Sequence, residues 1–348
     1  MNNKENNKNI DKMEKYMPIF TITPEILNFA YEIAADLERI DIIREKVLTP
    51  QLRKENRIRT IHSSLWIEAN SLTLEQVSDI VAGKRVTGPE KDILEVKNAI
   101  VAYDELLECN PYKEKDLLKQ HDLLMRGLIK DAGKYRNAGI GVFDGNVPIH
   151  VAPPYQRVAI LMNQLLDWTN NAKLPQVVKS CIFHYEFEFI HPFSDGNGRM
   201  GRMWQTLLLY QENPVFAWLP VESIIAHHQQ AYYRAIRRSS HHNDSGIFAQ
   251  FMLSVIKQAT AEFKEKHNTG EITNAGVNAG VNAGVKLSKT QEKIIALIAK
   301  NNNISQSDIA IKMKIDKSTV YRNVEKLKQM KILERKGADK KGIWIINN

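Results

Sequence analysis

The twelve residues from His191 to Arg202 constrain this chain more than any other stretch, because they must form a tight turn that leads into a helix. They read His-Pro-Phe-Ser-Asp-Gly-Asn-Gly-Arg-Met-Gly-Arg. The glycines allow the turn because glycine accepts positive φ angles and brings no Cβ. The apolar residues that follow recur at helical spacing and predict one packed helix face: Met203, Trp204, Leu207 and Leu208. Arg199 and Arg202 then share another face, one above the other.

The start of this helix is a predicted phosphate site. Successive backbone N–H groups of the Gly-Asn-Gly turn point at a common spot beside the positive end of the helix dipole. Such an arrangement binds anions, and phosphate groups in particular. The arginines add fixed positive charge and forked donors that match phosphate oxygens. The predicted phosphate ligands are Gly196, Asn197, Gly198, Arg199 and Arg202.

Two further side chains of the stretch suit a transfer reaction at that phosphate site. Asp195 offers a hard oxygen ligand for Mg²⁺ that bridges two phosphates. His191 precedes the turn, within reach of the proton on an attacking hydroxyl. Taken singly, these features are ordinary: a core or capping histidine, a plain turn and a solvated arginine face. Their conjunction within twelve residues favours phosphate-transfer chemistry.

The stretch resembles the signature of the Fic family, HPFx[DE]GNGRxxR, and matches it at every defined position. The resemblance implies a mostly α-helical fold and an enzyme that transfers AMP from Mg-ATP to a Ser, Thr or Tyr hydroxyl of a target protein or of itself. His191 would be the base that deprotonates the hydroxyl. Asp195 would hold Mg²⁺ on the α- and β-phosphates. The Gly-Asn-Gly turn would cradle phosphates, and Arg199 and Arg202 would hold the β,γ end.

Two other interpretations stay open at this point. One is a Fic enzyme that uses another nucleotide or removes AMP at the same site. The other is a DNA-binding regulator whose Fic body only senses nucleotide. The intact His191 argues against a pure sensor, since sensing requires no base.

Residues 63–70, Ser-Ser-Leu-Trp-Ile-Glu-Ala-Asn, resemble a second Fic feature, the inhibitory helix with the pattern [S/T]xxxE[G/N]. Ser64 and Glu68 match its spacing, whereas Ala69 stands where Gly or Asn is usual. The resemblance implies that Glu68 pairs with Arg202 and blocks productive placement of the γ-phosphate. By itself, Glu68 would be taken for a surface carboxylate.

Apolar periodicity predicts helices over most of the chain before residue 265. Pro24 fits a first helical position with Thr23 as its cap. The apolar run at 177–190 favours a buried helix that leads into His191 rather than a strand. His121 is expected in the core, and intrahelical bonding is preferred for the pair His184 and Glu188, which lacks a third metal ligand.

Between residues 139 and 152, β-prone pieces on either side of Asp144-Gly145-Asn146 predict a hairpin. The resemblance makes it a flap beside the active site that aligns target backbone by adding a strand. The expected organisation is a disordered polar tail at 1–16, an N-terminal helical region with the inhibitory helix at 17–115, and a catalytic domain at 116–265.

Residues 266–287 contain three Asn-Ala-Gly-Val repeats and predict a flexible linker, because such a sequence cannot build a core. Residues 288–348 resemble a winged helix-turn-helix domain of three helices and a hairpin. The start of its third helix is the expected DNA-facing element, with Lys317, Ser318, Thr319, Tyr321 and Arg322.

Charge supports a nucleic-acid partner for this last domain. Residues 286–348 hold 15 Lys and Arg against 6 Asp and Glu, a net +9, whereas the remaining 33 basic and 34 acidic residues give −1. A basic module suits duplex DNA, although winged helices also serve as protein-interaction platforms.

Composition and the lengths of the apolar runs indicate in which cellular compartment to expect the protein. No apolar run approaches the roughly 18–20 residues that span a bilayer, the N-terminus lacks a secretory signal, and the two cysteines give no disulfide framework. We therefore expect a cytoplasmic protein without a membrane partner, and leave a homo-oligomer open.

Overall fold

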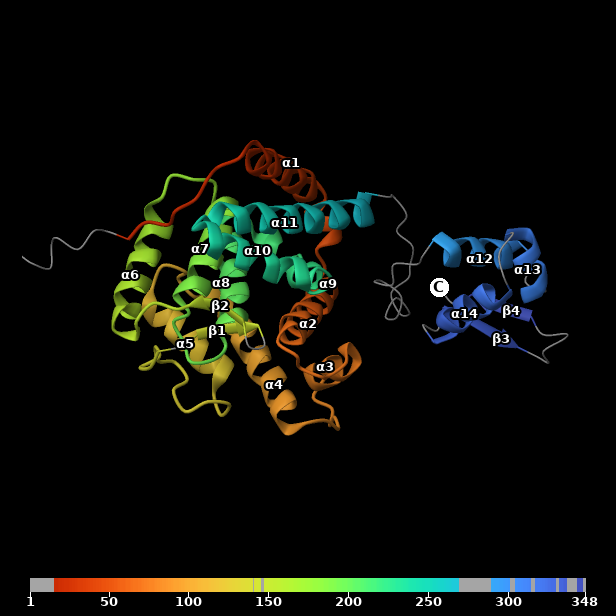
Figure 1. The fold of residues 1–348 in the computed structure, drawn as a ribbon, viewed down its shortest axis with the longest axis horizontal. Helices are drawn as coiled ribbons and strands as arrows, with labels where there is room; N and C mark the ends of the chain where they lie inside the picture. Colours follow the sequence, from red (N-terminus) through yellow and green to blue (C-terminus); the bar gives the residue numbers. More distant parts are fainter. Residues whose placement is uncertain are drawn as a thin grey trace, which may run out of the picture. The chain divides into compact units, whose positions relative to one another are not determined.

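The computed structural model describes most of the 348-residue chain (Figure 1). The described residues are 16–139, 141–144, 147–268, 289–300, 304–313, 317–329, 332–336 and 343–346. Tertiary contacts divide the chain into two compact units, residues 1–269 and residues 270–348. The Asn-Ala-Gly-Val repeats and nearly all of the expected N-terminal tail lie outside the described residues.

The larger unit is built from helices and one short antiparallel hairpin. Its α-helices are α1 (Pro24–Val47), α2 (Pro50–Ile67), α3 (Leu74–Val81), α4 (Glu90–Glu105), α5 (Glu114–Met125), α6 (Tyr155–Asn171), α7 (Gln176–Ile190), α8 (Asn197–Glu212), α9 (Val221–His227), α10 (Gln229–His242) and α11 (Ser245–Asn268). Short 3₁₀ segments are η2 (Leu106–Glu108) and η3 (Pro214–Trp218). The predicted hairpin is present as β1 (Gly141–Asp144) and β2 (Val147–Val151), with a register irregularity between Val142 and Phe143.

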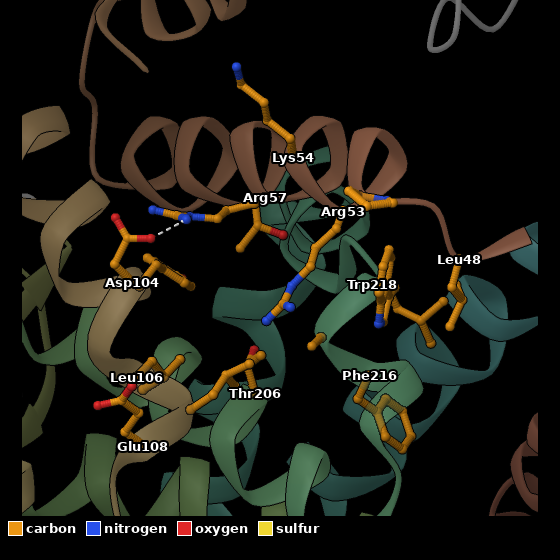
Figure 2. Close-up of a pocket in the computed structure, with 16 residues that line it drawn as sticks. Leu48, Arg53, Lys54, Arg57, Asp104, Leu106, Glu108, Thr206, Phe216 and Trp218 are labelled. Carbon is orange, nitrogen blue, oxygen red and sulfur yellow. Dashed lines mark ion pairs between the residues drawn. The ribbon is translucent and has the colours of Figure 1, made fainter. Parts of the chain in front are cut away.

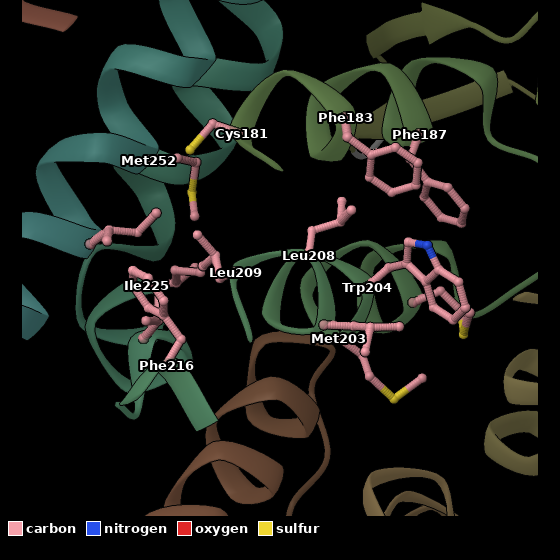
Figure 3. Packing of buried hydrophobic residues seen from close by; sticks show 14 of the residues in the cluster. Cys181, Phe183, Phe187, Met203, Trp204, Leu208, Leu209, Phe216, Ile225 and Met252 are labelled. Carbon is pink, nitrogen blue, oxygen red and sulfur yellow. The ribbon is translucent and has the colours of Figure 1, made fainter. Parts of the chain in front are cut away.

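Helices α7 and α8 form the centre of the larger unit (Figure 3). Every residue of α7 from Gln176 to Phe187 is buried, which confirms the buried helix expected there. Phe183 and Phe187 lie close to Trp204 of α8 in this core, and all three are fully buried. Helix α8 is buried on more faces than its apolar spacing predicts, because α2, α5, α7 and η3 all pack on it. The residues that follow the signature turn are therefore held rigidly.

Both ends of the larger unit differ slightly from expectation. Helix α1 begins as predicted, with Ile26 N donating to Thr23 Oγ1 at 3.3 Å, and packs along α11. Tyr16, expected in the disordered tail, donates its hydroxyl to Glu186 and so belongs to the folded unit. Helix α11 continues through Asn268, so the first three residues of the expected linker are helical. None of the described helices is both long and apolar enough to cross a membrane.

The smaller unit has the element order expected of a winged helix-turn-helix. It contains α12 (Lys289–Lys300), α13 (Gln306–Met313), α14 (Lys317–Gln329) and an antiparallel pair, β3 (Leu333–Lys336) and β4 (Ile343–Ile346). Ser305 caps α13, since its Oγ accepts from Asp308 N at 3.1 Å. The apolar core includes Trp344, whose Nε1 donates to Ile304 O at 2.9 Å. The tip between the two strands lies outside the described residues.

Candidate active site

His191 stands where α7 ends and the signature loop begins. Its backbone is left-handed (φ 50°, ψ 62°), and its N–H donates to Phe187 O at 2.9 Å. The imidazole Nδ1 lies 3.3 Å from the carbonyl oxygen of Glu188. Because a carbonyl only accepts, Nδ1 carries the ring proton in this contact and Nε2 carries the lone pair. That tautomer is the one a general base requires.

The turn after His191 is shaped by Asn197 and Gly196. The buried Asn197 side chain accepts from Phe193 N and donates to Phe193 O, both at 2.9 Å. Asn197 therefore closes the loop with its side chain, and its part in an anion site falls to its backbone N–H. Gly196 has φ +84°, and a Cβ there would lie 2.7 Å from Sδ of Met125. Both observations explain why glycine is needed at this position.

His121 of α5 also holds this loop in place. Its Nδ1 accepts from Gly133 N at 2.9 Å, so Nε2–H donates to the carbonyl oxygen of Asp195 at 3.0 Å. The ring stacks on Phe193 with centroids 3.6 Å apart. Burial lowers the pKa of His121 to about 4, which keeps the ring neutral at neutral pH. The predicted burial is confirmed, but apolar spacing gave no sign of the bond to Asp195.

Arg136 is a second loop-holding residue, and sequence reasoning missed it. The side chain is 3% exposed, and its Nε donates to His191 O at 2.8 Å while Nη2 donates to Pro153 O. Its backbone N–H donates to Pro192 O at 2.9 Å. Arg136 thus ties the catalytic loop to the segment that follows the hairpin. All of these partners are main-chain carbonyls, which no sequence motif records.

Arg199 is oriented by carboxylates on two sides. It is 5% exposed, and its guanidinium contacts Glu95 Oε1 of α4 at 3.1 Å and Asp195 Oδ1 at 3.1 Å. Glu95 also accepts from Asn70 Nδ2 at 2.8 Å, which fixes its carboxylate. Sequence reasoning missed Glu95, because it lies in an ordinary amphipathic helix pattern.

Arg202 is held by the two residues that match the inhibitory pattern. It is 2% exposed, with Nη2 donating to Glu68 Oε1 at 2.8 Å and Nε donating to Ser64 Oγ at 3.1 Å. Burial alone lowers the pKa of Arg202, but Glu68 raises it above its ordinary value. A Cβ on Gly198 would lie 2.4 Å from Glu68 Oε1, so this carboxylate presses against the first turn of α8. An anion thus sits where the sequence predicts a phosphate.

The backbone at Ala69 explains the one departure from the inhibitory pattern. Helix α2 ends at Ile67, and Glu68 is its C-cap. Ala69 follows with φ 65°, a left-handed conformation that favours Gly or Asn. The residue type usual at this position is thus the one the turn requires, and alanine adopts the conformation under strain.

The residues at the start of α8 fit a phosphate and a divalent cation. The helix begins without a side-chain cap, and buried Arg199 Nε and Arg202 Nη1 find no hydrogen-bond partner among the described residues. Asp195 is 51% exposed and keeps carboxylate surface for a cation. No group of three or more His, Cys, Asp or Glu side chains is placed to hold a metal in the described part of the chain. One carboxylate supplemented by phosphates and water is the arrangement Mg²⁺ accepts.

The pair His184 and Glu188 is bonded differently from the expectation. His184 Nδ1 contacts Gln205 Oε1 at 2.7 Å and Nε2 contacts the Tyr232 hydroxyl at 3.1 Å, whereas Glu188 Oε1 is 3.9 Å away. The histidine thus bonds to other helices rather than within α7. Burial lowers the pKa of His184 to about 3 and raises that of Glu188 to about 8.

The expected DNA-facing residues lie in the first half of α14. Tyr321 is 54% exposed there, and the carbonyl of Thr319 accepts from Asn323 Nδ2 at 2.8 Å. The side chains of Lys317, Ser318 and Arg322 lie outside the described residues, so only their positions on the helix are given.

Two family models match parts of the chain. The Fic/DOC family model matches residues 111–209, which include the signature loop, and the model of winged helix-turn-helix DNA-binding domains matches residues 287–334. A Fic family protein from Desulfovibrio desulfuricans G20 is 39% identical, with a TM-score of 0.70, and the match covers 96% of this chain and 99% of that one.

More distant relatives agree with this match. The protein adenylyltransferase Fic of Nematostella vectensis is 29% identical over 241 residues, which cover 62% of this chain and 52% of that protein. This chain spans about half the length of that curated relative, and 40% of the protein adenylyltransferase Fic of Drosophila willistoni. Residues 134–508 of Fic-1 from C. elegans share the fold at 17% identity and a TM-score of 0.55.

The near-complete match to the Desulfovibrio protein spans both units, and the signature loop supplies every defined position of the motif on a helical scaffold. The chain has a helical Fic fold followed by a winged helix-turn-helix domain, and it belongs to the Fic family.

Proposed function

We propose that this protein is an adenylyltransferase that moves AMP from Mg-ATP to a Ser, Thr or Tyr hydroxyl of a target protein or of itself. The observation that carries the proposal is the juxtaposition at the start of α8. His191 stands just before the glycine turn, and two buried arginines, Arg199 and Arg202, follow it in the first turns of α8. Arg199 Nε and Arg202 Nη1 have no hydrogen-bond partner among the described residues. The name of the Nematostella relative, protein adenylyltransferase, supports the same reaction.

In the proposed reaction, His191 takes the proton of the target hydroxyl through Nε2. The contact of Nδ1 with the Glu188 carbonyl keeps the ring in the tautomer that accepts at Nε2. The hydroxyl oxygen then bonds to the α-phosphorus, the bond from that phosphorus to the bridging oxygen breaks, and pyrophosphate leaves. Arg199 and Arg202 hold the charge of the leaving group, aided by backbone N–H groups at 196–198. Asp195 would hold Mg²⁺, which neutralises charge on the phosphates when bound.

We further propose that Glu68 inhibits this reaction in the state described here. Its carboxylate occupies the Arg202 donors and lies against Gly198, the place where the γ-phosphate is needed. ATP would then bind in a pose whose α-phosphorus is not in line with the incoming hydroxyl. Ser64 supports this state, because its hydroxyl and carbonyl both accept from Arg202.

Incubation of the full chain with ATP labelled on the α-phosphate, with and without cell lysate, tests the proposed activity. His191→Ala should abolish label transfer and leave ATP binding largely intact, because the histidine acts on the hydroxyl while the phosphates are held elsewhere. Transfer at a near wild-type rate in the alanine variant would show that the base is assigned wrongly. Mass spectrometry of products with each nucleotide, and of a pre-modified target, separates AMP transfer from use of another nucleotide and from AMP removal.

A second candidate function, duplex DNA binding by the smaller unit, rests on a separate observation. Residues 286–348 carry a net charge of +9, and Tyr321 is exposed in the first half of α14. Winged helix-turn-helix domains place this helix in the major groove. Electrophoretic mobility of random duplex DNA with the isolated 286–348 segment and the full chain tests the proposal. A protein-interaction role is favoured if neither binds.

A further inference from the structure

A cavity of about 720 Å³ opens along the first half of α2, outside the signature loop (Figure 2). Most of its lining residues come from α2, α4, η2, α8 and η3, and none belongs to residues 191–202. Leu106, Phe216 and Trp218 give it apolar walls. A concave site with apolar walls and a few converging polar groups is typical of small-molecule binding.

Of the three cations that line this cavity, Arg53, Lys54 and Arg57, only Arg57 forms an ion pair with a residue that the structure describes. Arg53 points into the cavity between Thr206 and Trp218 in Figure 2, with its guanidinium carbon 5.7 Å from the centroid of the Trp218 ring. It forms no ion pair with any residue that the structure describes. Arg57 is already paired with Asp104 and donates to Ile100 O at 2.9 Å. Of the two remaining cations, Arg53 lies beside the Trp218 ring and is placed to receive an anionic group.

Two threonine hydroxyls that line the cavity are already bonded to a buried carboxyl group. Thr60 and Thr206 line the cavity, and both donate their hydroxyls to the buried Glu222, at 3.3 Å and 3.0 Å. These hydroxyl protons are directed at the protein, so neither hydroxyl is a free donor for a ligand. The donors that remain beside the Trp218 ring are those of Arg53, and they suit a carboxylate on an apolar body.

We propose that this cavity binds a small organic monoanion, an aryl-substituted alkanoate, with its carboxylate on Arg53 and its ring against Trp218, and that binding is coupled to the Glu68–Arg202 contact. A guanidinium and a carboxylate match as a forked, charge-assisted pair. Burial of the ring against the apolar walls supplies the remainder of the affinity.

The coupling follows from the two helices that the cavity shares with the active site. Helix α2 carries Arg53 and Thr60 into the cavity and Glu68 to Arg202 at its other end. On α8, Thr206 lies one turn after Arg202, and its hydroxyl proton is shared between Glu222 Oε1 at 3.0 Å and the Arg202 carbonyl at 3.3 Å. A ligand that changes the spacing of α2 and α8 acts on both sites.

Tyr103 also lines the cavity, and its buried hydroxyl has no hydrogen-bond partner among the described residues. Burial and the nearby Glu222 raise the pKa of Tyr103, whereas the charge of Arg202 lowers it, so the hydroxyl is sensitive to the charges of both residues.

Isothermal titration of the full chain with indole-3-propionate and with its carboxamide tests the binding site. We expect the carboxylate to bind with a Kd of about 1 mM or tighter, as its size allows, and the amide to bind at least about tenfold more weakly. Arg53→Gln should weaken carboxylate binding by a similar factor. Arg59→Gln is the matched control, because Arg59 is another cation of α2 and does not line the cavity.

Arg53 is exposed, so its substitution should leave the fold intact, which circular dichroism verifies. Equal binding by Arg53→Gln and wild type, or no saturable binding of the carboxylate, overturns the proposal. A crystal structure with the probe at the start of α8 instead of the cavity also overturns it.

The coupling rests on the proposed inhibitory role of Glu68 and has its own test, which needs no AMP transfer. Because coupling is reciprocal, Glu68→Gly should change the Kd of indole-3-propionate by at least about fivefold. An unchanged Kd rejects the coupling and leaves the proposed reaction unaffected. If the protein proves inactive in AMP transfer but Glu68→Gly still changes the Kd, only the proposed reaction is rejected.

Discussion

Replacing Ala69 by glycine should make this protein more stable, although glycine usually destabilises. Ala69 is exposed and adopts φ 65° directly after Glu68. A left-handed conformation costs an L-residue roughly 1–2 kcal/mol. Glycine avoids that strain, but it increases the conformational entropy of the unfolded chain, which lowers the free energy of unfolding by roughly 0.4–1 kcal/mol. We therefore expect Ala69→Gly to raise the free energy of unfolding by about 0.5–1 kcal/mol.

Ala82 provides the matched control for this substitution. It is also exposed and also follows a helix, as the C-cap of α3, but it has φ −80° and ψ 3°. Ala82→Gly relieves no strain and should lower the free energy of unfolding by about 0.4–1 kcal/mol. Both substitutions remove the same methyl group, so the difference between them, about 1–2 kcal/mol, measures the left-handed strain.

Urea denaturation followed by tryptophan fluorescence suits the comparison, because four of the five tryptophans lie in residues 1–269. The transition of that unit should move to higher urea for Ala69→Gly and to lower urea for Ala82→Gly, with the slope unchanged. Equal destabilisation by both substitutions would refute the strain at Ala69, and with it the explanation of why Gly or Asn is usual there.

The remaining predictions concern the Arg202 contact, the pH dependence of stability and the smaller unit. Glu68→Gly should raise automodification by about tenfold or more, because charge-assisted arginine bonds contribute roughly 1.5–3 kcal/mol and a decade of rate corresponds to roughly 1.4 kcal/mol. Arg202→Ala should show no such gain, either alone or combined with Glu68→Gly. If the automodification rate of Glu68→Gly equals that of wild type across an ATP titration, Glu68 is not inhibitory. Burial raises the pKa of Glu188 from 4.5 to about 8, so between these pH values the carboxyl group is protonated in the folded state and ionised in the unfolded state. The free energy of unfolding therefore falls as the pH rises from 4.5 to 8. Glu188→Gln should therefore stabilise the protein more at pH 8 than at pH 5 in denaturation experiments, and the reverse order would reject the burial of a neutral carboxyl. Deleting residues 286–348 should remove DNA binding without removing automodification, and the binding of the intact chain should weaken steeply with salt; salt-insensitive binding would point away from phosphate contacts.

The local chemistry of the site could be predicted from the sequence because its parts are contiguous. His191, Asp195 and the two arginines fall within twelve residues, and a glycine turn before a helix fixes their relative positions through backbone geometry alone. The same holds for α7, where the length of the apolar run and Pro175 near its start favoured a helix over a strand, and for the hairpin on either side of residues 145–146. Helices α9 and α10 were not predicted, since residues 221–242 mix histidine, arginine and tyrosine without a clear apolar period.

The contact between Glu68 and Arg202 was expected only through resemblance to other Fic proteins. Nothing in residues 63–70 by themselves distinguishes Glu68 from a surface carboxylate, and the two partners are 134 residues apart. The structure also supplies what the pattern left unexplained, the left-handed backbone at Ala69.

Only the tertiary structure revealed the residues that hold the loop and the cavity beside α2. Arg136 reaches carbonyls 55 residues away, Glu95 reaches Arg199 across 104 residues, and Arg53 meets a ring on η3. Apolar periodicity identifies which residues are buried but not which distant groups they meet, because partners are chosen by helix packing. Within a short motif, local backbone geometry fixes how the residues lie relative to one another. The partners of buried polar groups are instead decided by which hydrogen bonds can form once the helices are packed.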